Sequence, residues 1–217
     1  MYSPLELLQG GPSGLLTFAL LAGALILAIG LHEYAHALAA DLQGDRLPRA
    51  MGRLTVNPLK HLDPLGTALI LLVGFGWGKP VEFRPEALAS RRFGAAIVAL
   101  AGPMMNVLLA ILGGLLFRLA SLGPDLEFLD DFLGQFIFFN AVLAVFNLIP
   151  VPPLDGSRLL TIFLPPSKQN IIFFLDRYGF LIILVVVFLG PRTLLEPLID
   201  FVLQIVANLT GITYAPR

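Results

Sequence analysis

One long apolar segment near the start of the chain constrains the fold more than any other feature. From Gly14 to Ala40 the residues are almost all apolar or small, and the segment exceeds the roughly 20 residues that a helix needs to cross a bilayer. It nevertheless contains three ionisable side chains, within His32-Glu33-Tyr34-Ala35-His36. Each such group near the bilayer centre costs about 2.5 to 3.5 kcal/mol on insertion scales. Three together require compensation, which a bound cation would supply.

The spacing of the two histidines is that of metal ligands on a helix. Residues four apart lie one above the other on the same face, so His32 and His36 can hold one ion while Glu33 flanks it. Imidazole is a common zinc ligand. If Asp41 marks the water boundary, the histidines lie roughly 8 to 14 Å inside it, at about 1.5 Å per residue. The sequence therefore predicts a metal site within the membrane.

Composition excludes several classes of protein. With 57% hydrophobic and 13% charged residues, the chain does not have the composition of a soluble globular domain. A net charge of −1 gives no basic field, so we expect no nucleic-acid partner. Cysteine is absent, which removes disulfides and thiolate zinc ligands. The first residues lack the positive region of a signal peptide, and we expect none to be cleaved.

The remaining apolar stretches predict an all-α polytopic membrane protein with one domain over residues 1–217. Its three-helix catalytic core would occupy about 14–164, and about two peripheral transmembrane helices would occupy about 165–212. The expected elements are spans at Gly14–Ala40, Phe93–Leu119 and Phe132–Ile149, a re-entrant or interfacial segment at Leu65–Phe75, a short extended piece at Lys79–Phe83, a short helix at Ser157–Leu164, and peripheral spans at Asn170–Leu189 and Leu194–Ile212. Asn57-Pro58 and Asp63-Pro64 are helix-start signals.

Basic residues predict the orientation in the membrane. Eight lie between the first two core spans, whereas the loop after the second contains four acids: Arg46, Arg49, Arg53, Lys60, Lys79, Arg84, Arg91 and Arg92, against Asp125, Glu127, Asp130 and Asp131. The basic side should be cytoplasmic. Counting spans puts Asp155 on that same side, so the candidate site would face the cytoplasm.

A catalytic zinc site needs a third protein ligand beside the two histidines. Asp155, Asp176 and Glu196 are the main candidates. Asp155 is favoured, because the three prolines just before it free its backbone from helix geometry and Gly156 allows a sharp turn. The alternative is that Asp155 only caps a short helix. His61 could also coordinate, but its polar loop favours a structural hydrogen bond.

This set of residues predicts metal-assisted amide hydrolysis. One Zn²⁺ ion would lower the pKa of its water toward about 7, and Glu33 would act as the general base and later protonate the leaving amine. A substrate helix in the membrane must first be unwound, because its amides are already hydrogen-bonded. The piece from Lys79 to Phe83, with Val81 at its centre, could hold the unwound segment by strand pairing.

The combination of two motifs resembles the site-2 protease family of intramembrane zinc metalloproteases. The resemblance runs from about Leu25 to Leu164 and is carried by His32–His36, Thr55–Gly66, Gly76–Val81, Ala101-Gly-Pro-Met-Met-Asn106 and Asn147-Leu-Ile-Pro-Val-Pro-Pro-Leu-Asp155-Gly156. It implies a three-helix core, zinc ligation by His32, His36 and Asp155, Glu33 as catalytic base, and Asn147 near the reacting group.

The resemblance also implies a biological role. Family members cleave single-span membrane proteins or signal-peptide remnants in regulated intramembrane proteolysis. We expect a minimal form, without a PDZ or nucleotide-sensing domain, in a bacterial or archaeal cytoplasmic membrane. Two other functions remain open, a membrane metal-binding or transport protein and a non-catalytic scaffold that binds transmembrane helices. Neither needs Glu33 beside the ligands, and no residue pattern specifies an oligomeric state.

Overall fold

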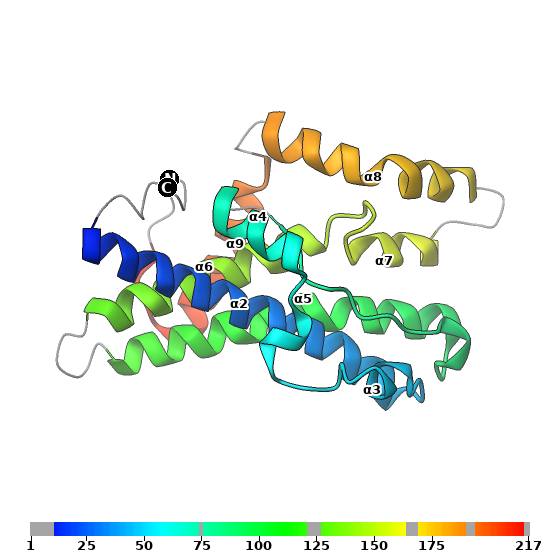
Figure 1. Cartoon of the computed structure of the whole chain (residues 1–217), viewed down its shortest axis with the longest axis horizontal. Coiled ribbons are helices and arrows are strands. Elements are labelled where there is room, and N and C mark those ends of the chain that lie inside the picture. Colours follow the sequence, from blue (N-terminus) through cyan, green and yellow to red (C-terminus); the bar gives the residue numbers. More distant parts are fainter. Residues whose placement is uncertain (1–10, 74–75, 121–126, 164–168, 190–193, 215–217) are drawn as a thin grey trace.

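Three long helices form the centre of the structure, a computed structural model that describes residues 11–73, 76–120, 127–163, 169–189 and 194–214 (Figure 1). They are α2 (Gly11–Leu42), α5 (Arg91–Ala120) and α6 (Glu127–Asn147), and each packs against the other two. Within the described residues, these three helices are long and apolar enough to cross a membrane. The prediction of an all-α polytopic membrane protein is confirmed.

Small side chains bring the three helices close together. Ala28 of α2, Ala110 of α5 and Ala141 of α6 are completely buried, as expected where helices in a membrane pack through small residues. On the outside of α5, by contrast, Leu116 and Leu119 are 56% and 64% exposed. This inversion of the soluble pattern suits a helix bundle surrounded by lipid.

The third core helix differs from its predicted bounds at both ends. It begins at Glu127 rather than Phe132, because acidic residues in a first helical turn interact favourably with the helix dipole and need not end the helix. It ends at Asn147 rather than Ile149, since Pro150 disfavours helical backbone in the residue before it. The other two core spans lie within helices that extend slightly beyond the predicted limits.

Two peripheral helices and one short helix complete the C-terminal part. α7 (Gly156–Phe163) packs on α5, α8 is Gln169–Leu189, and α9 (Glu196–Thr210) packs on α5 and α6. With 15 residues, α9 is shorter than the roughly 20 that a perpendicular crossing needs. α8 also contacts the proline-rich loop between α6 and α7. A Cβ on Gly179 of α8 would be 3.1 Å from the carbonyl carbon of Pro152 in that loop.

Short elements connect α2 to α5. They are α3 (Leu47–Ala50), the 3₁₀ helix η1 (Pro58–His61), α4 (Pro64–Val73) and the 3₁₀ helix η2 (Pro85–Ala87). Both predicted start signals are confirmed: Asn57 Oδ1 accepts from the Leu59 amide at 3.1 Å, and Asp63 Oδ1 accepts from the Gly66 amide at 2.8 Å. α4 has 10 residues, too few to cross a bilayer.

The segment between Lys79 and Arg84 is fixed at both ends. The Lys79 amide donates to the His61 carbonyl at 2.7 Å, and the Arg84 amide donates to Asp45 Oδ2 at 2.6 Å. Burial would raise the pKa of Asp45, but hydrogen bonds from the Arg84 and Leu47 amides and the Arg84 guanidinium hold it below its usual value. An ionised Asp45 therefore anchors the segment. Within the described residues, the isolated bridge between Leu62 and Gly78 lies just before this segment.

Replacing Gly30 with alanine should destabilise the fold. A Cβ there would lie 2.6 Å from the Pro58 Cβ and 2.8 Å from its Cα, and such overpacking costs about 1–3 kcal/mol. At Gly23 on the same helix the nearest atom is 4.0 Å away, at Phe132. We expect Gly30→Ala to lower the midpoint of thermal unfolding in detergent and Gly23→Ala to leave it unchanged or higher. Equal midpoints would contradict the close contact of α2 with η1.

Candidate active site

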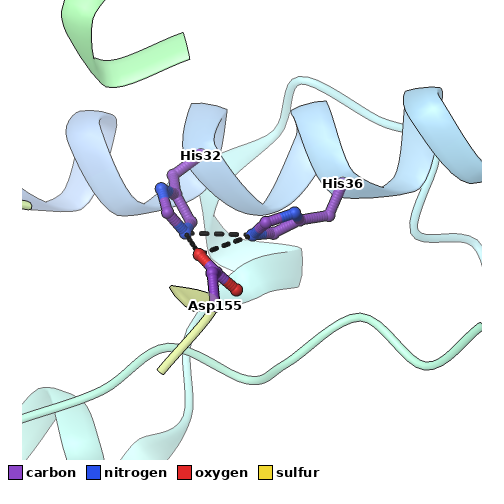
Figure 2. A group of neighbouring side chains, drawn as sticks. All are labelled: His32, His36 and Asp155. Atoms are coloured by element: carbon purple, nitrogen blue, oxygen red, sulfur yellow. Dashed lines mark hydrogen bonds and ion pairs between the residues drawn. The ribbon is translucent and has the colours of Figure 1, made fainter. Parts of the chain in front are cut away.

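His32, His36 and Asp155 converge on one point beside α2 (Figure 2). Asp155 Oδ2 lies 3.1 Å from His32 Nε2 and 3.2 Å from His36 Nε2, and the two Nε2 atoms are 3.0 Å apart. The histidines are 5% and 7% exposed. Within the described residues, these three form the group of side chains that could hold a metal ion.

Two separate parts of the chain supply the group. The histidines lie one helical turn apart on α2, whereas Asp155 lies in the loop between α6 and α7. Turns within that loop, including the Leu154 amide bonded to the Val151 carbonyl at 3.0 Å, carry the carboxylate back toward α2. Gly156 is needed because a Cβ there would lie 2.5 Å from the Ile149 carbonyl oxygen. A close approach of backbone, and not a left-handed turn, explains this glycine.

The hydrogen-bond partners of the two Nδ1 atoms indicate which nitrogen of each imidazole carries the proton. His36 Nδ1 lies 2.7 Å from the Val98 carbonyl oxygen, and His32 Nδ1 lies 2.5 Å from Asn106 Oδ1. Because these oxygens only accept, each Nδ1 carries a proton, and in the neutral ring that binds a metal each Nε2 presents a lone pair. Asp155 Oδ2 has no hydrogen-bond donor either. Three acceptors thus face one another in a buried place, an arrangement that a cation would stabilise.

The spacing of the three donor atoms also fits zinc. Ligand atoms about 2.0–2.1 Å from a tetrahedral zinc ion are about 3.3 Å apart, close to the observed 3.0, 3.1 and 3.2 Å. Two imidazoles and one carboxylate suit this metal. Such a set of three leaves the fourth position for water or substrate, as in catalytic sites. The residues present therefore fit a single zinc ion.

Glu33 lies next to this group without belonging to it. Its Oε2 accepts a hydrogen bond from the Val81 amide at 3.1 Å. The extended segment that the sequence assigned to the substrate is thereby connected to Glu33. Lys79 contributes its amide to the His61 carbonyl, and its side chain is exposed.

Two other predicted residues make hydrogen bonds outside the group of His32, His36 and Asp155. Asn147 Nδ2 donates to the Leu143 carbonyl of its own helix at 3.0 Å. His61 is completely buried, with Nε2 at 2.8 Å from the Thr55 carbonyl. That contact agrees with the expected hydrogen-bonding role of His61.

Sequence reasoning missed three residues at the site. Asn106 Oδ1 is hydrogen-bonded to His32 Nδ1, and Asn106 Nδ2 donates to Asn140 Oδ1 at 2.8 Å. Gly102 lies against both imidazoles. Both asparagines are completely buried. A polar amide within an apolar span was the available signal, because such groups need internal partners in a membrane. Which partner each would find depends on helix packing.

A bundle of helices that are long and apolar enough to cross a membrane, with two histidines and an aspartate brought together, defines a membrane protein with a candidate metal centre. The family model for peptidase family M50 matches residues 20–125 and 125–188. The chain belongs to peptidase family M50, the family of site-2 proteases, and this confirms the resemblance. It is a zinc metalloprotease of that family.

Individual relatives agree with this assignment. The chain is 40% identical to YwhC of Bacillus subtilis strain 168 over 167 residues, which are 74% of this chain and 76% of the relative. It is 33% identical to Rip2 of Mycolicibacterium smegmatis over 184 residues, 77% of this chain and 66% of the relative. Both are named as candidate zinc metalloproteases. No solved structure matches the chain.

Replacing Gly102 with alanine should weaken zinc binding. A Cβ there would lie 2.5 Å from His32 Cε1 and also clash with His36, so the rings must move. An overpacking cost of about 1–3 kcal/mol placed on the ligands corresponds to roughly a tenfold loss or more. The measurement is zinc affinity by competition with a chromophoric chelator.

Gly113→Ala is the matched control for this prediction. Gly113 lies on the same helix and is also tightly packed, with Ile137 at 3.0 Å and Phe136 at 3.2 Å, but it touches no ligand. Its substitution should lower stability and leave zinc affinity unchanged. If both variants bound zinc like the wild type, the close contact between α5 and the imidazoles would be wrong.

Proposed function

We propose that this chain is an intramembrane endopeptidase that uses one zinc ion to cut peptide bonds within or near transmembrane segments. The observation that carries the proposal is the convergence of His32 Nε2, His36 Nε2 and Asp155 Oδ2, with separations of 3.0–3.2 Å. These atoms lie on or beside a membrane-spanning helix that also bears Glu33. A site at this depth serves substrates that are themselves in the membrane.

The proposed roles follow from the chemistry of each group. Zinc held by His32, His36 and Asp155 supplies Lewis acidity, which activates water and polarises a carbonyl. Glu33 takes the proton of the attacking water and passes it to the leaving amine. The Val81 amide engages Glu33 Oε2, which orients the carboxylate and assigns the proton to Oε1.

Substrates and location are inferred from the same features. We assign single-span membrane proteins and signal-peptide remnants as substrates, in a bacterial or archaeal cytoplasmic membrane. The basic residues of the connection between α2 and α5 support a site that faces the cytoplasm. Two of them, Arg46 and Arg49, pair with Asp41 at 2.8 and 2.7 Å at the end of α2. Asn147 remains a proposed contact for the reacting carbonyl.

The Glu33→Gln variant tests the proposed reaction. Purified wild type and variant are mixed in detergent with zinc and a panel of single-span substrates, and fragments cut within the span are identified by mass. Cleavage should vanish in Glu33→Gln, because the amide cannot accept the proton, while zinc content stays at the wild-type level. Asp155→Asn should lose both cleavage and zinc affinity.

The alternatives predict other outcomes in this experiment. Cleavage by both wild type and Glu33→Gln would exclude Glu33 as the base. Zinc bound by both with cleavage by neither, across the panel, would favour a metal-binding or transport protein. Partner binding without zinc would favour a scaffold.

The segment from Lys79 to Phe83 is our candidate for holding an unwound substrate by strand addition. The amides of Lys79 and Val81 both donate toward the protein, as alternate residues of an extended chain do. Pro80 and Glu82 alternate with these two residues, so that the Glu82 amide is directed to the opposite edge of the segment. Glu82 is exposed. Since Pro80 has no N–H, we assign the Glu82 amide to the substrate strand.

Glu82→Pro should therefore impair cleavage about tenfold, because it removes this donor while proline keeps the preceding residue extended. The matched control is Glu82→Ala, which retains the amide and should cleave normally. Val81→Pro should also lose cleavage, through loss of the Glu33 contact. Normal cleavage by both proline variants, measured as kcat/KM on one substrate, would rule out this mode of binding.

A further inference from the structure

Two buried asparagines connect His32 of α2 to α6 by hydrogen bonds. Asn106 Oδ1 is 2.5 Å from His32 Nδ1, and Asn106 Nδ2 is 2.8 Å from Asn140 Oδ1 and 3.3 Å from the Ala28 carbonyl oxygen. Asn140 Nδ2 in turn lies 2.8 Å from the Phe136 carbonyl oxygen. This series of hydrogen bonds runs from α6 through α5 to α2, and both asparagines are completely buried.

The Phe136 carbonyl determines the direction of every hydrogen bond in this series. The Phe136 carbonyl can only accept, so Asn140 presents its NH₂ group to Phe136 and its Oδ1 to Asn106. Asn106 must then present its NH₂ group to Asn140 and its Oδ1 to His32. The imidazole is left to donate from Nδ1, which keeps the lone pair on Nε2.

We propose that Asn140 is a positioning residue for zinc. It orients the amide of Asn106, and through it selects the tautomer of His32 whose Nε2 faces Asp155 and His36. The side-chain hydrogen bonds of Asn140 go to Asn106 and to the Phe136 carbonyl, so that Asn140 acts on His32 through Asn106. This inference rests on the proposed metal site and extends it to a residue on a third helix.

The cost of the opposite orientation supports the proposal. If the Asn106 amide were reversed, its oxygen would face Asn140 Oδ1 and the Ala28 carbonyl, and each unsatisfied buried acceptor costs about 1–3 kcal/mol. Without Asn140, only the longer bond to Ala28, at 3.3 Å, opposes the reversal. A reversed amide would direct N–H groups at His32 Nδ1 and move the proton to Nε2. Loss of such supporting partners typically costs about 10–100-fold in metal affinity.

Two substitutions at position 140 separate orientation from packing. Asn140→Leu fills a similar volume but offers no acceptor, whereas Asn140→Asp, neutral in this buried place, keeps an oxygen for the Asn106 NH₂ group and an O–H group for the Phe136 carbonyl. Zinc affinity of the full chain in detergent is measured by chelator competition. We expect a loss of about tenfold or more for Asn140→Leu and near wild-type affinity for Asn140→Asp. Thr210→Val, which removes a buried hydroxyl that donates to the Val206 carbonyl within α9, is the control and should bind zinc normally.

A second readout reports the tautomer directly. The chain has three histidines, so their ¹⁵N resonances can be assigned in metal-free protein at a pH where the rings are neutral. His32 should carry its proton on Nδ1 in the wild type and shift toward Nε2 in Asn140→Leu. His36, which faces the main-chain Val98 carbonyl, should not change. His61, whose Nε2 faces the Thr55 carbonyl, gives the reference spectrum of the other tautomer.

The outcomes distinguish this inference from the function on which it rests. Wild-type zinc affinity and an unchanged His32 tautomer in Asn140→Leu would overturn it, and so would equal losses in the Leu and Asp variants. If Asn140→Leu does not fold, Asn140→Ala decides: it removes the acceptor for Asn106 without adding bulk, so zinc affinity should fall about tenfold, and wild-type affinity overturns the proposal. A wild type that binds no zinc would contradict the proposed function itself.

Discussion

The mutual approach of three lone-pair-bearing atoms is the constraint on which the rest of the structure depends. His32 Nε2, His36 Nε2 and Asp155 Oδ2 lie 3.0–3.2 Å from one another, and without a cation they repel. They stay together because rigid elements hold each one: a single helix for the histidines and a turn before α7 for the aspartate. A zinc ion held there, as we propose, would turn this unfavourable arrangement into a bound site.

The membrane makes the supporting contacts as important as the ligands. In an apolar bundle a polar side chain without a partner is costly. The Val98 carbonyl, Asn106 and Asn140 satisfy the outer edges of the two imidazoles and one another. The same contacts orient the rings, so that one set of hydrogen bonds stabilises the fold and prepares the site. Small residues such as Gly102 leave the space in which the rings lie.

The connection between α2 and α5 also contributes to the site, because its Val81 amide donates to Glu33. Asp45, His61 and Glu33 each accept an amide of the segment from Lys79 to Arg84. The sequence indicated an extended piece here and assigned it to substrate. In the structure one of its amides serves Glu33, so the same backbone that is proposed to hold a substrate also holds the proposed base.

The sequence by itself determined what depends on neighbouring residues. The long apolar runs specify the core helices, the four-residue spacing puts His32 and His36 on one face, and Pro150 ends α6 before Asp155. The tertiary structure decided what depends on packing between distant segments. His32 meets Asn106 across 74 positions, His36 meets Val98 across 62, and Val81 meets Glu33 across 48. Local periodicity carries no information about such pairs, because the relative placement of helices sets which buried polar groups satisfy one another.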